Sequence, residues 1–224
     1  MSMPFYVAPE QVMKDKADYA RKGIARGRAL IATVYADGIL LCAQNHSRTL
    51  HKVNEIYDRI AFAGVGKFNE YDQLRQAGVR HADIKGYQYS REDVDARSLA
   101  NAYAQSIGHA FTDNMKPLEI EILVAELGLE AGQDQIYRVL YDGTVMDESR
   151  FCVLGGESEE IAERMEDGWA PTMDRAASLA KCVAALDDEG DLTPESVEAA
   201  VLDRTQGRRA FRRITTDEIR TALS

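Results

Sequence analysis

The residues Gly64-Val-Gly66-Lys67 follow an apolar run, as the phosphate-binding loop of nucleotide-binding proteins does. That loop needs a further glycine five residues before Gly66, and a serine or threonine directly after the lysine. The sequence has Ala61 and Phe68 at these positions, so neither requirement is met. We therefore interpret the segment as a tight turn from a strand into a helix, without nucleotide chemistry.

Histidine and glutamate side chains offer two other kinds of site. No two histidines have the spacing of metal ligands, and no cysteine stands beside one in a ligand pattern, so we expect no metal. Glu119 and Glu121 alternate along one expected strand and could form a carboxylate pair. Two solvated charges on the outward face of that strand are the preferred interpretation. The four histidines are His46, His51, His81 and His109.

The three cysteines, Cys42, Cys152 and Cys182, lie within apolar runs or on a half-buried helix. They are expected to be small core residues rather than nucleophiles. Three scattered cysteines are too few for a disulfide framework and suit a reducing cytosol.

Length, composition and charge limit the class of protein. The 224 residues, with 45% hydrophobic and 29% charged residues, predict one folded domain over residues 1–224. The net charge of −10 argues against binding to nucleic acid or to an anionic membrane. No apolar stretch approaches the roughly 20 residues that span a bilayer. The first residues also lack a secretory signal. A cytoplasmic location is therefore expected.

The first half of the chain predicts a helix, a group of strands and two more helices. A loose segment, 1–8, precedes a helix at 9–26 with Pro9 in its first turn. That helix has only a narrow apolar stripe, which predicts packing against something outside its own core. Strands are expected at 29–35, 39–43 and 59–63, and helices at 68–77, ended by Gly78, and at 95–115.

The second half repeats this grouping. Strands are expected at 118–127, 135–141 and 151–154, and helices at 157–167 and 173–186. Thr193 and Pro194 predict the start of a short helix that reaches Asp203. A charged strand at 210–214 and a helix from Thr216 complete the chain. Helices therefore come in groups between groups of strands, which favours an α+β fold of two stacked, largely antiparallel sheets covered by helices on both outer sides.

Basic residues gather in two places. Residues 1–28 hold six basic and three acidic side chains, although the whole chain is acidic. Arg208, Arg209, Arg212 and Arg213 form a second cluster. Two solvated faces would explain both groups, and the alternative is that both meet acidic groups of neighbouring subunits.

Short motifs occur along almost the whole chain, at 20–27 (ARKGIARG), 50–53 (LHKV), 56–59 (IYDR), 66–70 (GKFNE), 98–105 (SLANAYAQ), 140–143 (LYDG), 155–156 (GG) and 208–214 (RRAFRRI). Together they resemble the motifs of α subunits of the actinobacterial 20S proteasome. Relatives of this kind often carry a longer tail than the one that ends here at Ser224.

The resemblance implies a four-layer αββα Ntn-hydrolase sandwich with an added N-terminal helix. Catalysis in this family belongs to β-type subunits, whose N-terminal threonine provides the nucleophile and its own activating amine. Here Gly27-Arg28 and a whole helix precede the first strand, and no threonine, serine or cysteine stands at its start. A non-catalytic subunit without a cofactor is therefore expected. The alternative is a free-standing Ntn hydrolase, and a scaffold unrelated to proteolysis is a third hypothesis.

The resemblance also implies partners and site residues. Seven α subunits would form each outer ring of an α7-β7-β7-α7 barrel. These rings would dock an AAA ATPase activator and admit unfolded protein substrates. Lys52 would bind the C-terminal carboxylate of the activator between adjacent α subunits, with Gly27, Gly66 and Lys67 lining the same pocket. Without the resemblance, Lys52 would be interpreted as a solvated lysine. The gate would consist of Met1, Ser2, Met3, Pro4, Phe5, Tyr6, Val7 and Ala8.

Overall fold

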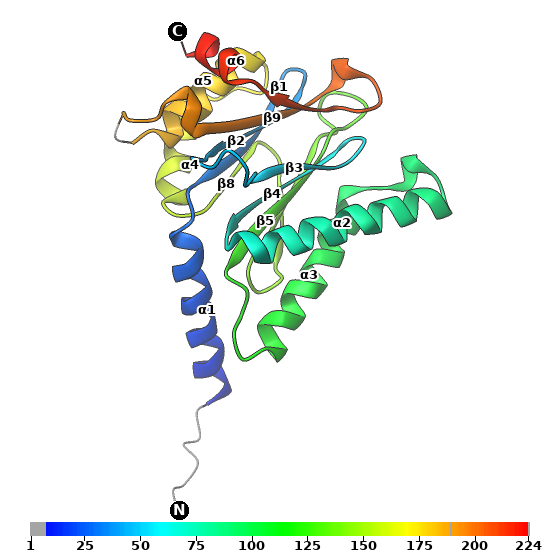
Figure 1. Cartoon of the computed structure of the whole chain (residues 1–224), viewed down its shortest axis with the longest axis vertical. Coiled ribbons are helices and arrows are strands. Elements are labelled where there is room, and N and C mark those ends of the chain that lie inside the picture. The colour runs from blue at the N-terminus through cyan, green and yellow to red at the C-terminus, as the bar shows by residue number, and fades with distance from the viewer. Residues whose placement is uncertain (1–7, 189, 224) are drawn as a thin grey trace, which may run out of the picture.

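Two five-stranded sheets face each other between two layers of helices (Figure 1). The computed structural model describes residues 8–188 and 190–223. One outer layer consists of α2 and α3, and the other of α4, α5 and the short C-terminal α6. The four-layer αββα sandwich with an added N-terminal helix is therefore confirmed.

The elements follow the expected grouping of helices and strands. The helices are α1 (Pro9–Ala25), α2 (Phe68–Gln88), α3 (Ala96–Asp113), α4 (Ser158–Glu166), α5 (Arg175–Leu186) and α6 (Thr216–Ala222), with 3-10 turns η1 (Arg91–Asp93), η2 (Pro194–Ser196) and η3 (Arg204–Gln206). The strands are β1 (Leu30–Tyr35), β2 (Gly38–Gln44), β3 (Val53–Tyr57), β4 (Ile60–Gly66), β5 (Ile120–Glu126), β6 (Gln135–Val139), β7 (Val145–Glu148), β8 (Phe151–Leu154), β9 (Val197–Asp203) and β10 (Phe211–Ile214). Within the described residues, no helix is long and apolar enough to cross a membrane.

The first sheet has the strand order β10-β9-β2-β1-β8 and the second β3-β4-β5-β6-β7. Neighbouring strands in both sheets pair antiparallel. Strand β9 pairs with β2 from Gly38↔Asp203 to Gln44↔Val197. The prediction of a helix over 193–203 was therefore wrong: only a 3-10 turn forms after Thr193, and the apolar run behind it becomes an interior strand between β2 and β10.

Side chains of the interior strands are buried on both faces. In β1, Leu30 and Ala32 contribute to the core between the two sheets, whereas Ile31 and Tyr35 pack toward α4 and α5. Because successive side chains of a strand point to opposite faces, a strand covered on both sides must be apolar at nearly every position. This explains the continuous apolar runs in the sequence.

Helix α2 is about twice as long as expected, because Gly78 does not end it. Gly78 lies buried inside the helix, where a Cβ would overlap the hydroxyl of Tyr103 on α3 and lie 2.7 Å from its Cζ. Glycine here serves close helix packing rather than termination. Strands β3 and β7 were not predicted, because both are edge strands of mixed polarity: VNEIY and VMDE.

We expect Gly78→Ala to destabilise the chain by about 1–3 kcal/mol, because the added methyl group overpacks the α2–α3 contact. Gly108→Ala on α3 is the matched control, since its Cβ would meet only Asp142 O at 3.6 Å. That control should gain about 0.5–1 kcal/mol from the better helix propensity of alanine. The measurement is the free energy of unfolding of the full chain in a denaturant titration.

The double variant Gly78→Ala/Tyr103→Phe should recover part of the lost stability, because it removes the hydroxyl that the methyl group overlaps. Equal stability of Gly78→Ala and the wild type would contradict the proposed role of this close contact.

Candidate functional site

The junction between α1 and β1 packs directly on the end of β4. A Cβ at Gly27 would lie 2.6 Å from Val65 Cγ1 and 2.9 Å from the Gly66 nitrogen, so a larger residue does not fit. Gly66 has φ +106° and passes so close to the Glu119 carbonyl that glycine is also required there. The structure thus brings together Gly27 and Gly66, which are far apart in the sequence.

Lys67 connects this junction to α2. Strand β4 ends at Gly66 and α2 begins at Phe68, so the expected strand-to-helix turn is confirmed. The Lys67 backbone N–H donates to the Glu119 carbonyl at 3.0 Å, and the Lys67 ammonium lies 3.1 Å from Glu119 Oε1. The charge of Lys67 is therefore engaged within the chain.

Glu119 and Glu121 are not solvated, and the prediction that they face outward was wrong. Glu119 is 8% exposed and pairs with Lys67 and with Lys116, whose ammonium lies 2.8 Å from Glu119 Oε1. The hydrogen bond from Lys116 is the main reason that the pKa of Glu119 is lowered. Glu121 is 4% exposed and pairs with Arg138 on the neighbouring strand. Because β5 lies between the other sheet and the α2–α3 layer, it has no outward face.

Helix α1 makes limited contact with the rest of the chain (Figure 1). Ala20 and Ile24 are buried against Tyr141, and Gly23 sits so close to the Glu119 side chain that a Cβ would overlap its carboxylate. By contrast, three large apolar side chains of α1 are exposed to solvent. These are Val12, Met13 and Tyr19.

The expected gate residues lie mostly outside the described part of the chain. Residues Met1, Ser2, Met3, Pro4, Phe5, Tyr6 and Val7 are not described. Ala8 is exposed and forms the N-cap of α1, where its carbonyl accepts hydrogen bonds from Gln11 N at 2.9 Å and Val12 N at 3.2 Å.

The Lys52 side chain reaches the same junction. Its ammonium donates a hydrogen bond to the backbone carbonyl of Arg28, the residue after Gly27. The pKa of Lys52 is lowered to about 8, chiefly by burial; Glu198 opposes this effect, and the charge of Arg28 adds to it. Lys52 is thus half-buried rather than freely solvated. It carries a cation against a neutral carbonyl, whereas the cation of Lys67 faces a carboxylate.

Sequence reasoning missed Glu198, which contacts the backbone of Lys52. Glu198 Oε2 accepts from Lys52 N at 2.9 Å, and Glu198 Oε1 accepts from Val53 N at 3.2 Å. The residue was overlooked because it stood in a segment assigned to a helix. The run VEAAVLD at 197–203 is apolar enough to indicate a strand and was the available signal.

The C-terminal arginines bind acidic groups of their own chain, so the hypothesis that they reach acidic groups of neighbouring subunits is not needed to explain them. Arg209 pairs with Glu55, and Arg213 pairs with Glu198 at 2.9 Å. Arg212 pairs with Glu218, and Arg208 lies 3.7 Å from Asp58. These pairs join the end of the chain to β3, β9 and α6.

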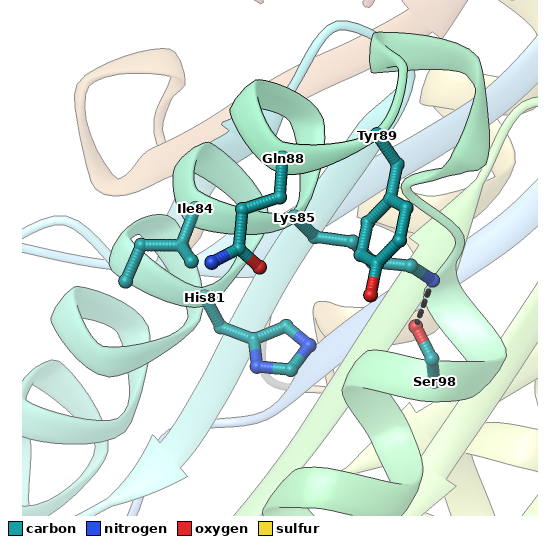
Figure 2. Close-up of a pocket in the computed structure, with 6 residues that line it drawn as sticks. All are labelled: His81, Ile84, Lys85, Gln88, Tyr89 and Ser98. Carbon is teal, nitrogen blue, oxygen red and sulfur yellow. Dashed lines mark hydrogen bonds between the residues drawn. The ribbon is translucent and has the colours of Figure 1, made fainter.

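A shallow pocket of about 380 Å³ lies elsewhere, between α2 and α3 (Figure 2). It is lined by His81, Ile84, Lys85, Gln88, Tyr89 and Ser98, and the Lys85 ammonium bridges the helices by donating to Ser98 Oγ at 3.1 Å. His81 follows Lys67 by about four helical turns, so this pocket is separate from the α1–β1 junction.

The cysteines are core residues, as expected. Cys42, Cys152 and Cys182 are free and buried, and burial raises the pKa of Cys42 to about 12. A thiol with so high a pKa is a poor nucleophile near neutral pH. Among the described residues, no group of three or more His, Cys, Asp or Glu side chains is arranged to hold a metal ion.

Known proteins are similar in sequence to this chain over nearly its whole length. Residues 24–202 match the family model described as proteasome subunit. A protein named proteasome subunit alpha from Acidimicrobium ferrooxidans is 59% identical over 224 residues, which cover 100% of this chain and 97% of that protein. A protein of the same name from Sanguibacter keddieii is 56% identical over 220 residues, 96% of this chain and 86% of its own.

Proposed function

The chain belongs to the proteasome subunit family, in its alpha type, and on that premise we propose that it is a non-catalytic subunit that forms the outer rings of the 20S core particle, gates the proteolytic chamber and docks an ATPase activator. Residues 1–224 act as one α-type domain, with 1–8 as the gating segment and 9–26 as the N-terminal helix. The particle works in the cytoplasm, where its buried cysteines stay reduced.

The observation that carries this proposal is the incomplete packing of α1. The helix buries Ala20 and Ile24 but leaves Val12, Met13 and Tyr19 in solvent. Exposed apolar side chains on a projecting helix are typical of a contact with another chain. Neighbouring copies in a homo-heptameric ring would cover these residues and would bring the seven N-terminal segments together at a central pore.

A second surface supports additional protein partners. The last turns of α2 and the residue after it expose Ile84, Tyr87 and Tyr89, and Tyr87 is 92% exposed. Aromatic residues are enriched in the buried centres of protein interfaces. Such a surface fits a chain that assembles with β subunits rather than one that works alone.

The start of β1 supports the non-catalytic role. The strand begins at Leu30 and is preceded by α1 and the close-packed Gly27, so its first residue has no free amine. An N-terminal nucleophile needs such an amine to act as its own base. The catalytic threonines of the particle therefore belong to the β subunits, and unfolded proteins that pass the gate are their substrates.

The test is the native mass of the pure protein mixed with its β partner. We expect a particle of two α and two β heptamers, in which neighbouring subunits bury the exposed apolar side chains of α1 and of the end of α2. A chain that stays monomeric under these assembly conditions would contradict the proposal. Peptidase activity of the isolated chain would instead favour a free-standing hydrolase. If the β subunits degrade substrates equally well with and without this chain, a scaffold unrelated to proteolysis would be favoured.

A further inference from the structure

Residues 45–52 carry the chain from one sheet to the other and hold Lys52 at their end. Strand β2 ends at Gln44 in the first sheet, and β3 begins at Val53 in the second. Apolar packing contributes little to holding this segment, since its residues are mostly exposed or half-buried. Polar contacts must therefore set the position of Lys52.

One carboxylate, that of Glu198 on β9, contacts both ends of this segment. Glu198 pairs with Ala43 across the sheet, two residues before the segment begins. It accepts from Asn45 Nδ2 at 2.7 Å, in addition to the backbone N–H groups of Lys52 and Val53. Asn45 in turn donates to the Leu50 carbonyl at 2.8 Å. The first and last residues of the segment thus meet at one side chain.

Lys52 is consequently held at both ends. Its backbone N–H is bound by Glu198, and its ammonium is bound by the Arg28 carbonyl next to the α1–β1 junction. A flexible lysine loses much side-chain entropy when it binds a ligand, and a side chain already held in one direction loses less.

We propose that Glu198 is a positioning residue for the docking site, which aims the Lys52 ammonium at the α1–β1 junction before an activator arrives. This inference rests on the proposed docking of an ATPase activator, and on the role that the resemblance implies for Lys52 as the group that binds the activator carboxylate. Glu198 itself would not contact the ligand, because its oxygens already accept hydrogen bonds from Lys52 N, Val53 N, Asn45 Nδ2 and Arg213 Nη1.

The charge of Glu198 does not oppose an incoming carboxylate. The Arg213 guanidinium lies 2.9 Å from Glu198 Oε1 and also donates to the Val53 carbonyl at 2.8 Å, while His51 Nδ1 lies 3.3 Å from Glu198 Oε1. Arg213 offsets the negative charge, and Glu198 is only 10% exposed in its side chain. At the junction, the cation of Lys67 faces the Glu119 carboxylate, whereas the cation of Lys52 faces the neutral Arg28 carbonyl.

The experiment uses the assembled particle and a synthetic peptide with the C-terminal sequence of its ATPase, prepared as the free acid and as the C-terminal amide. The affinity of each peptide is measured through its stimulation of fluorogenic substrate hydrolysis. Glu198→Gln should weaken binding of the free acid about tenfold, because the amide keeps one oxygen for two of the four donors around residue 198 and turns an NH₂ group toward the other two. Glu195→Gln, on the exposed pair with Arg220, is the matched control and should bind like the wild type.

A double-mutant cycle separates positioning from general destabilisation. In the Lys52→Ala background, Glu198→Gln should cause little further loss, because the two residues act through the same ammonium. A full additional tenfold loss in that background would overturn the proposal, as would wild-type affinity of Glu198→Gln itself.

Failure of the inference and failure of the proposed function are distinguishable. If Lys52→Ala binds the free acid like the wild type, the docking function of Lys52 fails. If Lys52→Ala loses affinity and Glu198→Gln does not, only the positioning role fails. Should Glu198→Gln not assemble, Glu198→Asp keeps the charge but cannot reach all of its donors; unchanged affinity in that variant would equally overturn the inference.

Discussion

Removing residues 1–8 is expected to raise peptide hydrolysis by the assembled particle several-fold. Seven copies of this segment would obstruct one pore, and the catalytic β subunits would be unchanged by the deletion. A small peptide then enters by diffusion through an open channel, so the hydrolysis rate rises without any change in the chemical step. The measurement is fluorogenic peptide hydrolysis by wild-type and truncated particles at equal concentration.

The structure sharpens the design of this deletion. The Ala8 carbonyl caps the first turn of α1, so a deletion that includes Ala8 also removes that cap. A matched variant that lacks only residues 2–7 keeps Ala8 and should show the same rise if the segment itself is the obstruction. A glycine–serine replacement of equal length tests whether bulk alone closes the pore. Unchanged hydrolysis in both deletions would mean that the segment is not the gate.

Lys52→Ala is expected to abolish most activator-stimulated degradation while the particle still assembles. Removing one member of a partly buried charge pair costs about 2–5 kcal/mol of binding, and the loss is repeated at each pocket of the ring. Stimulated degradation of an unfolded protein is measured against activator concentration, and native mass confirms assembly. Lys181→Ala on α5 removes the same charge elsewhere and should behave like the wild type.

The pH dependence of stimulation provides a second readout for Lys52. With the pKa of Lys52 lowered to about 8, its ammonium is charged below that pH and loses its proton above it. Stimulation by the wild type should therefore hold below about pH 8 and decline as the pH rises through it. An arginine keeps its charge over this pH range, so stimulation of the Lys52→Arg particle should not decline as the pH rises through 8. Normal stimulation of Lys52→Ala would remove the residue from the site.

Much of the layer order follows from local sequence patterns. The continuous apolar runs of β1, β2 and β5 predict strands covered on both faces, because only such strands are buried at nearly every position. The same local logic misassigned residues 193–203: Thr193 and Pro194 do start a turn, but β2 and β10 supply hydrogen-bond partners that turn the following residues into a strand. Such partners are distant in the sequence, and the local signal for the strand is limited to the apolar run at 197–203.

The candidate site shows the same division. Gly27, Gly66, Lys67 and Lys52 were selected through a resemblance, and nothing in their spacing shows that Gly27 touches the end of β4 or that Lys52 reaches Arg28. Glu119 and Glu121 were assigned to solvent because a charged residue on a strand is usually exposed. Their burial depends on Lys67, Lys116 and Arg138, which fold against them from other elements.

The sequence by itself therefore determined the α+β class, the extra N-terminal helix, the core position of the three cysteines and the lack of a nucleophile at the start of β1. These depend on residue type and local periodicity, which act within one element. The tertiary structure alone decided that Glu198 holds Lys52, that Glu119 lies beneath Gly23 and that Gly78 packs on Tyr103. Each of these contacts joins residues from separate elements, and its energy exists only when the two sheets and their helix layers have packed together.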